Sequence, residues 1–215
     1  MLEKQIREQI ISLINREVVP AVGCTEPMCV SLCVAKATET LGCRPEKITA
    51  LLSANILKNA MGVGIPGTGM IGLPIAIALG ALVGKSEYQL EVIKDLTRET
   101  LEEGKQYINE DHIYIKLKQG ITEKLYVEIH CKADGHEAIA VIATDHTRFV
   151  YEEKDGEVLM DNRKPAGAVA ANNDIRLNMR LVYDFATTTP LDEIRFILKT
   201  REYNFRIAEE SKKAN

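Results

Sequence analysis

The sequence Leu125-Tyr-Val-Glu-Ile-His-Cys131 is followed, across Asp134-Gly135, by Glu137-Ala-Ile-Ala-Val-Ile-Ala143. Both segments alternate in the way that is typical of β-strands with one buried face. Asp-Gly favours a tight turn, so the two segments predict an antiparallel hairpin. Two further segments continue this pattern, Ile113–Leu117 and a second hairpin over 149–159 that turns at Asp155-Gly156.

The rest of the chain has the periodicity of helices. Apolar residues recur every three or four positions in residues 2–17, which predicts an amphipathic helix. The other predicted elements are a helix from Cys24 or Thr25 to Leu41, a strand over 48–57, helices over 70–83 and 87–107, a surface loop over 161–178 and a helix over 191–211.

This order predicts an α+β fold. N-terminal helices with a Gly-rich loop occupy residues 1–110, and a mostly antiparallel sheet with a C-terminal helix occupies residues 111–215. We expect the two segments to form one compact unit.

Composition argues against several classes of protein. The 215 residues carry a net charge of −4 and contain no Trp, which disfavours nucleic acid as a partner. Residues 59–84 are uncharged, but the Gly and Pro residues in their first half disfavour a membrane span, so membrane association is only a weak alternative. Five cysteines and a charged, amphipathic N-terminus favour a cytoplasmic protein with free or metal-binding thiols.

Cys24 is the first candidate for chemistry. A thiol at a helix N-terminus is expected to have a lowered pKa, and a thiolate is both a nucleophile and a metal ligand. The alternative is a small buried cysteine at a helix start. Cys29 and Cys33 share one helix face, and the spacing C-x4-C-x3-C is not a standard cluster motif, so we expect them to be core residues.

The second candidate is the glycine-rich segment Asn59-Ala-Met-Gly-Val-Gly-Ile-Pro-Gly-Thr-Gly-Met70. Its backbone N–H groups are suited to an anion, with Asn59 and Thr68 as nearby polar groups for a carboxylate. The alternative is that Gly64 and Gly67 only permit tight packing. If this loop faces Cys24, the two form a site for a small anionic substrate.

Taken together, three motifs resemble the L-cysteine desulfidase family, which is related to the α subunit of iron–sulfur L-serine dehydratases. They are Pro20-Ala-Val-Gly-Cys-Thr-Glu-Pro27, Lys58–Met70 and Asp145-His-Thr147, and the resemblance extends over nearly the whole chain. It implies a [4Fe-4S] lyase of amino-acid catabolism that converts L-cysteine to pyruvate, ammonia and sulfide. An open iron of such a cluster acts as a Lewis acid on the leaving group.

The resemblance also implies roles for particular residues. Cys24 would be a cluster ligand or an acid/base group, and Glu26 would join it in catalysis. The residues expected to contact the amino-acid substrate are Thr25, Asn59, Gly64, Gly67, Thr68 and His146; a solvated histidine is the alternative for the last.

Family members are about twice as long as this chain, so the chain resembles the N-terminal half of a larger enzyme. The remaining cluster ligands would then come from a cysteine-rich C-terminal half or a second subunit, in an oligomer. Two other functions stay open: a serine dehydratase-type deaminating lyase subunit, and a non-catalytic subunit that binds an amino acid or acts as a scaffold.

Overall fold

The computed structural model describes residues 2–21, 23–163 and 175–213. Its internal contacts divide the chain into two units, Pro20–Ala168 and a second one made of Met1–Val19 and Val169–Asn215. We call them the sheet unit and the helical unit. They differ from the expected segments 1–110 and 111–215, because a strand from the first segment pairs with two strands from the second.

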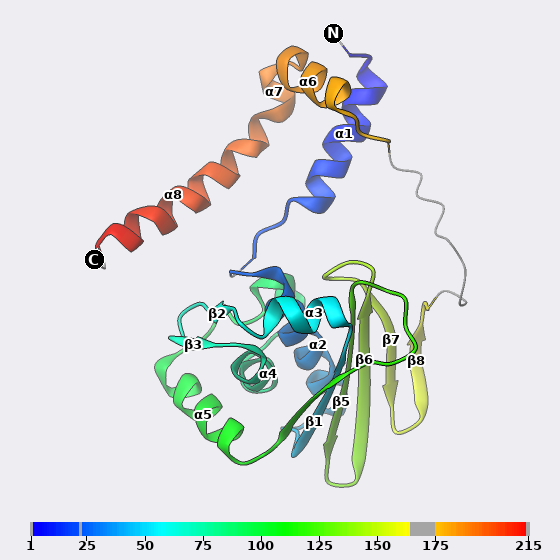
Figure 1. Ribbon diagram of the computed structural model, residues 1–215, viewed down its shortest axis with the longest axis vertical. Coiled ribbons are helices and arrows are strands. Elements are labelled where there is room, and N and C mark those ends of the chain that lie inside the picture. The colour runs from blue at the N-terminus through cyan, green and yellow to red at the C-terminus, as the bar shows by residue number, and fades with distance from the viewer. Residues whose placement is uncertain (1, 22, 164–174, 214–215) are drawn as a thin grey trace. The chain divides into compact units, whose positions relative to one another are not determined.

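The sheet unit contains a six-stranded, mostly antiparallel sheet (Figure 1). Among the strands that the structure describes, only the first pair is parallel, and the two predicted Asp-Gly turns close hairpins. The strand order is β4 (Ile113–Leu117), β1 (Lys47–Leu52), β5 (Tyr126–Ala133), β6 (His136–Ala143), β7 (Phe149–Lys154) and β8 (Glu157–Asp161). The α+β prediction is therefore confirmed.

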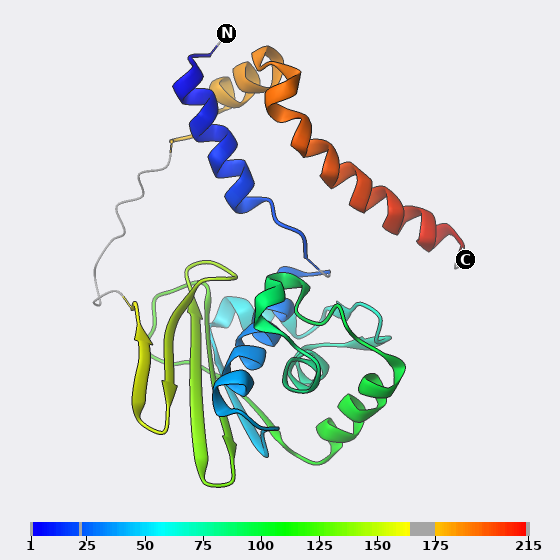
Figure 2. The same ribbon diagram turned by 180° about the vertical axis from the view of Figure 1, so that it is seen from behind.

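Helices cover one face of this sheet in successive layers (Figure 2). Helix α2 (Thr25–Leu41) packs on β5 and β6, α4 (Leu73–Leu82) packs on α2, and α5 (Arg98–Asn109) packs on α4. Close contact between α2 and α4 requires Gly80, because a Cβ there would lie 2.6 Å from the carbonyl oxygen of Ser31. Cys29 and Cys33 are fully buried in this core, as predicted.

Three predicted elements are corrected. The strand expected over 48–57 ends at Leu52, because Ser53 caps a short helix, α3 (Ala54–Ala60). The helix expected over 87–107 is two elements, the 3₁₀ helix η1 (Ser86–Glu91) and α5, because Thr97 forms a capping box that starts a new helix. The last helix is also divided, into α7 (Leu191–Ile194), η2 (Arg195–Ile197) and α8 (Leu198–Lys213).

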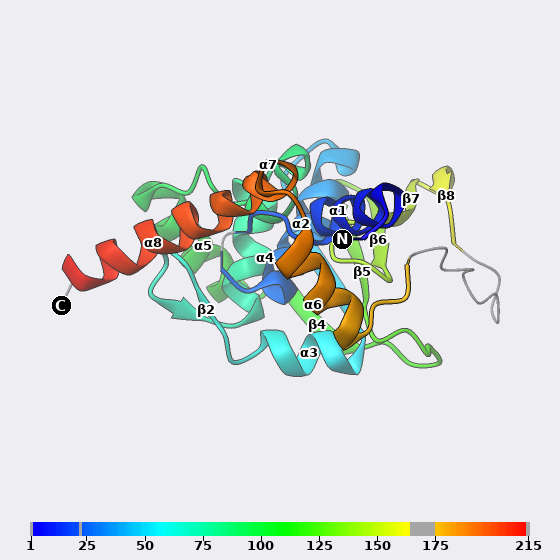
Figure 3. The same ribbon diagram turned by 90° about the horizontal axis from the view of Figure 1, so that it is seen from above.

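The helical unit consists of α1 (Lys4–Glu17), α6 (Met179–Thr188), α7, η2 and α8. Within it, α6 lies beside α1 (Figures 1 and 3). Arg7 of α1 holds Glu193 of α7 through two hydrogen bonds, of 2.9 and 2.8 Å. Helix α6 was not predicted, and most of the loop expected over 161–178 lies outside the described residues.

No helix among the described residues is long and apolar enough to cross a membrane. The apolar part of residues 59–84 forms α4, which has 10 residues.

The face of β5 opposite α2 carries a network of charges. Glu128 accepts hydrogen bonds from Lys118 at 2.7 Å and from Tyr126 at 2.5 Å. His130 lies between two carboxylates, with Nε2 2.8 Å from Glu128 and Nδ1 3.0 Å from Glu137. Burial alone would raise the pKa of Glu128, but the hydrogen bonds from His130, Lys118 and Tyr126 outweigh it and hold that pKa at about 2. The carboxylate of Glu128 likewise raises the pKa of His130.

This network predicts that stability falls as the pH rises above neutrality. Because the pKa of His130 is raised in the folded state, its contribution is complete below its unfolded value of 6.5 and is lost as the pH rises through the folded value. We expect the wild type to be less stable at pH 8.5 than at pH 5.5 through this group. The urea unfolding midpoint, followed by circular dichroism, measures the loss.

His130→Gln is expected to remove most of that pH dependence. The matched control is His136→Gln, which changes a histidine whose side chain is 61% exposed, and it should keep the wild-type difference between the two pH values. An equal pH dependence in wild type and His130→Gln would contradict the prediction.

Candidate functional site

Three of the side chains that the sequence predicts at the site donate hydrogen bonds to the carboxylate of Glu26. Cys24 is the N-cap residue of α2, and its Sγ donates to Oε2 of Glu26 at 3.0 Å. Thr25 donates its hydroxyl to the same oxygen at 3.1 Å. Asn59, from α3, donates its Nδ2 to Oε1 at 3.2 Å. The start of α2 and the end of α3 therefore meet at one half-buried carboxylate.

The lowered pKa expected for Cys24 is wrong. Burial raises the pKa of the thiol, and the neighbouring Glu26 carboxylate raises it further, so the backbone N–H groups of the helix start are outweighed. The hydrogen bond from Cys24 lowers the pKa of Glu26, and this effect is larger than the increase that burial causes. The pair thus keeps its proton on the sulfur and its negative charge on the carboxylate.

This charge distribution predicts the reactivity of the thiol. Glu26→Gln removes the negative charge that disfavours the thiolate, so we expect iodoacetamide to alkylate Cys24 about three to ten times faster at pH 7.5. The measurement is made on a Cys43→Ser background, because Cys43 is exposed and the other three cysteines are buried. Glu87→Gln, an exposed glutamate of η1, is the control and should leave the rate unchanged. A slower or unchanged rate in Glu26→Gln would contradict the assigned charge.

The two sequence motifs also lie close together where Gly23 approaches the ring of Pro66. Gly23 has φ +80°, and a Cβ at this position would lie 2.5 Å from Cγ of Pro66. Pro66 belongs to the hairpin formed by β2 (Gly64–Ile65) and β3 (Met70–Ile71), which contains most of the glycine-rich segment. The loop before Cys24 and the glycine-rich segment therefore face each other.

The residues of the β2–β3 hairpin differ in whether their polar groups are free to bind another molecule. Gly64 and Gly67 are exposed, and Gly67 has φ +76° in the turn. Thr68 is buried, and its hydroxyl donates to the carbonyl oxygen of Ile65 at 2.6 Å and accepts from the N–H of Met70 at 2.9 Å. The hydroxyl of Thr68 thus closes the turn, whereas the two glycines present open backbone.

His146 lies in the loop between β6 and β7 and is half-buried. Its neighbour Asp145 accepts hydrogen bonds from the N–H and the hydroxyl of Thr147, at 3.1 and 3.3 Å. Burial raises the pKa of Cys29, and the charges of Asp145 and Glu26 add to this effect, so both carboxylates lie near the first turns of α2. A substrate contact for His146 stays a prediction.

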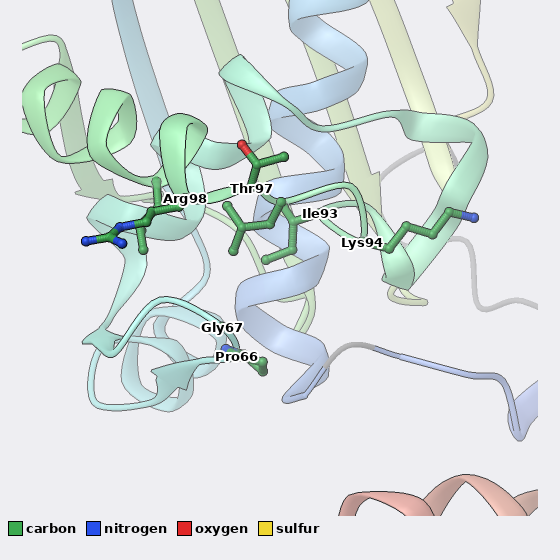
Figure 4. Close-up of a pocket in the computed structure, with 8 residues that line it drawn as sticks. Pro66, Gly67, Ile93, Lys94, Thr97 and Arg98 are labelled. Atoms are coloured by element: carbon green, nitrogen blue, oxygen red, sulfur yellow. The ribbon is translucent and has the colours of Figure 1, made fainter. Parts of the chain in front are cut away.

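A surface hollow adjoins the hairpin (Figure 4). Pro66 and Gly67 form one side and the start of α5 forms the other, while Lys94 and Arg98 extend in opposite directions rather than toward a common point. The residues that line it are Pro66, Gly67, Ile93, Lys94, Leu96, Thr97, Arg98 and Leu101. Since Pro66 also touches Gly23, the hollow is next to the loop that carries Cys24.

The cluster that the resemblance implies does not fit the described residues alone. In residues 2–21, 23–163 and 175–213, no three His, Cys, Asp or Glu side chains are grouped so that they could hold a metal ion. Cys33 donates to the carbonyl oxygen of Ala140 at 3.3 Å, and Cys131 is fully buried beside Thr38. Among the described residues Cys24 is the one thiol at the site, and a single thiolate does not hold a [4Fe-4S] cluster.

Several curated proteins that are similar to this chain are named UPF0597 protein. The chain is 64% identical to one from Phocaeicola vulgatus and 60% identical to one from Bacteroides thetaiotaomicron, in each case over all 215 residues and 50% of the relative. It is 44% identical over 220 positions to one from Porphyromonas gingivalis, covering 51% of that protein.

The chain spans about half the length of the curated relatives it matches. No family model and no solved structure matches it. The name of these relatives states no substrate or reaction.

Proposed function

We propose that this chain is one half of a lyase that degrades L-cysteine to pyruvate, ammonia and sulfide. The observation that carries the proposal is the contact among Cys24, Glu26 and Asn59, set against the glycine-rich hairpin. The half-length match supports a site that is completed by residues outside this chain. The resemblance of the same motifs to cysteine desulfidases supplies the reaction.

In this proposal the chain contributes proton transfer and substrate binding. Elimination removes the α-proton and the β-thiol of cysteine, and hydrolysis of the resulting enamine gives pyruvate and ammonia. Cys24 retains its proton at neutral pH and is suited to exchange it with the substrate, while Glu26 orients the S–H bond. The exposed backbone of Gly64 and Gly67 is suited to the substrate carboxylate.

We propose a positioning role for Asn59 beside the substrate contact expected from the resemblance. Its amide nitrogen donates to Glu26, so we assign Asn59 to holding the carboxylate of Glu26 in place. If a cluster is present, Cys24 would either keep its proton and act as the acid/base group or bind the cluster as a thiolate, and the other ligands would come from outside this chain. No part of the mechanism above depends on that cluster.

The test is pyruvate formation from L-cysteine and from L-serine by the complete protein. The chain is co-expressed with the unmatched half of the Phocaeicola vulgatus relative and reconstituted anaerobically with iron and sulfide. Pyruvate and sulfide from cysteine would support the proposal. Pyruvate from serine alone would favour the dehydratase, and amino-acid binding without pyruvate from either substrate would favour a non-catalytic subunit.

A further inference from the structure

Ser53 connects the start of α3 to the segment that leads into β5. Its backbone N–H donates to the carbonyl oxygen of Tyr126 at 3.0 Å, and its hydroxyl donates to that of Lys124 at 2.8 Å. The same hydroxyl accepts from the N–H of Ile56 at 3.4 Å, as the N-cap of α3. Ser53 is 2% exposed, and all four residues belong to the sheet unit. The first turn of α3 is therefore fixed to the sheet from inside this unit.

The other end of α3 reaches the candidate site. The helix lies across one end of the sheet (Figure 1), and Nδ2 of Asn59 in its last turn lies 3.2 Å from Oε1 of Glu26. This distance is at the long end of the range for an N–H···O hydrogen bond, so a shift of about 0.5 Å would weaken or break it. Asn59 is only about 9 Å along the helix from Ser53. The placement of the helix start thus decides whether Asn59 reaches the carboxylate.

Apolar packing alone does not fix α3 with this precision. The helix has 7 residues, well below the roughly 12–15 that an isolated helix needs to be even marginally stable in water. Its buried residues are Ile56 and Ala60, and burial of apolar surface has no preferred direction. A hydrogen bond has a preferred distance and angle, so the bond from Ser53 to Lys124 determines where α3 begins and in which direction it leaves the sheet.

We propose that Ser53 is a positioning residue of the candidate site, which acts through α3 and Asn59 to hold the Glu26 carboxylate beside Cys24. The hydroxyl of Ser53 bonds to groups outside the site, so its effect reaches the thiol only through these residues. While Glu26 is held, its charge disfavours the thiolate of Cys24. Once Asn59 releases it, the carboxylate can turn toward water, and the thiolate becomes easier to form.

The inference rests on the proposed function for its meaning in catalysis, but its test requires neither pyruvate formation nor the second half. The test is the rate at which iodoacetamide alkylates Cys24, measured as a function of pH on the Cys43→Ser background. Ser53→Ala is expected to raise this rate about two- to fivefold at pH 7.5 and to move the pH profile to lower pH. Asn59→Ala should have the same effect.

The double variant Ser53→Ala/Asn59→Ala tests the route of the effect. Two residues that act through one chain of contacts do not have additive effects, so the double variant should react no faster than Asn59→Ala alone. Two independent residues would instead multiply their separate increases.

Ser31→Ala is the matched control. Ser31 of α2 is also fully buried, but its hydroxyl has no hydrogen-bond partner among the described residues, so its removal should leave the alkylation rate unchanged. Circular dichroism checks that every variant keeps its helices. If Ser53→Ala does not fold, Ser53→Gly replaces it, because glycine also lacks the hydroxyl and is better tolerated than alanine at an N-cap.

A wild-type or slower alkylation rate in the Ser53 variant would overturn the proposal. The same holds for an increase that is equally large in the Asn59→Ala background, because Ser53 would then act by another route. An equal increase in Ser31→Ala would show that loss of any buried hydroxyl loosens the site. Absence of pyruvate from the complete protein is a separate result: it contradicts the lyase and leaves the role of Ser53, read from alkylation, in place.

Discussion

Cys24→Ala is expected to lower pyruvate formation from L-cysteine by the complete protein roughly 100- to 10,000-fold, the range that loss of an acid/base group produces. The thiol is the group that carries the transferable proton in the contact with Glu26, and alanine has no group to replace it. The fold should survive, because Cys24 makes no side-chain capping bond to α2 and is only half-buried. The measurement is the initial rate of pyruvate formation under anaerobic conditions.

Cys43→Ala is the matched control. Cys43 is exposed, so its replacement should leave both the rate and the unfolding midpoint unchanged. If Cys24→Ala retains the wild-type rate while Cys43→Ala also does, no thiol of this site takes part in the reaction, and the proposed role of Cys24 is wrong.

The sequence predicts well those parts of the fold that depend on residues close together in the chain. The alternation in β5 and β6 and the Asp-Gly turns predict the hairpins, since period and turn chemistry fix strand faces and register. The division at residues 92–97 was missed because a helical composition continues across it, and Thr97 is recognised as a cap only through its bonds with Thr100.

The sequence predicts which residues belong to the candidate site, but it does not predict which of their side chains contact each other. The sequence indicates Cys24, Thr25 and Glu26 together because they share a helix start. That Asn59 reaches Glu26 depends on how α3 packs beside α2, which no local pattern encodes. The raised pKa of Cys24 likewise depends on burial and on the orientation of the Glu26 side chain, and these outweigh the helix terminus on which the sequence-based expectation relied.

The network around His130 was missed for a different reason. Alternation on β5 places Tyr126, Glu128 and His130 on one face, and this signal was present in the sequence. The partners Lys118 and Glu137 come from a loop and from another strand, so the network is visible only once the register is known.

The contact between Gly23 and Pro66 predicts the second large effect. Gly23→Ala introduces a Cβ 2.5 Å from the Pro66 ring and holds a non-glycine residue at φ +80°. A left-handed conformation costs a non-glycine residue about 1–2 kcal/mol, and overpacking adds about 1–3 kcal/mol, so we expect a loss of about 2–5 kcal/mol in the free energy of unfolding. The rate of pyruvate formation should fall as well, because the loop that carries Cys24 moves away from the hairpin.

Gly64→Ala is the control that separates this contact from a general effect of glycine. A Cβ at Gly64 meets no atom within 4 Å, and its φ is not in the left-handed region, so the change should stay within about 0.5 kcal/mol. Urea unfolding of the two variants measures both values. Equal stability of Gly23→Ala and Gly64→Ala would show that the Cys24 loop does not rest on Pro66. The two motifs would then act separately, and the single site assembled from them would have to be abandoned.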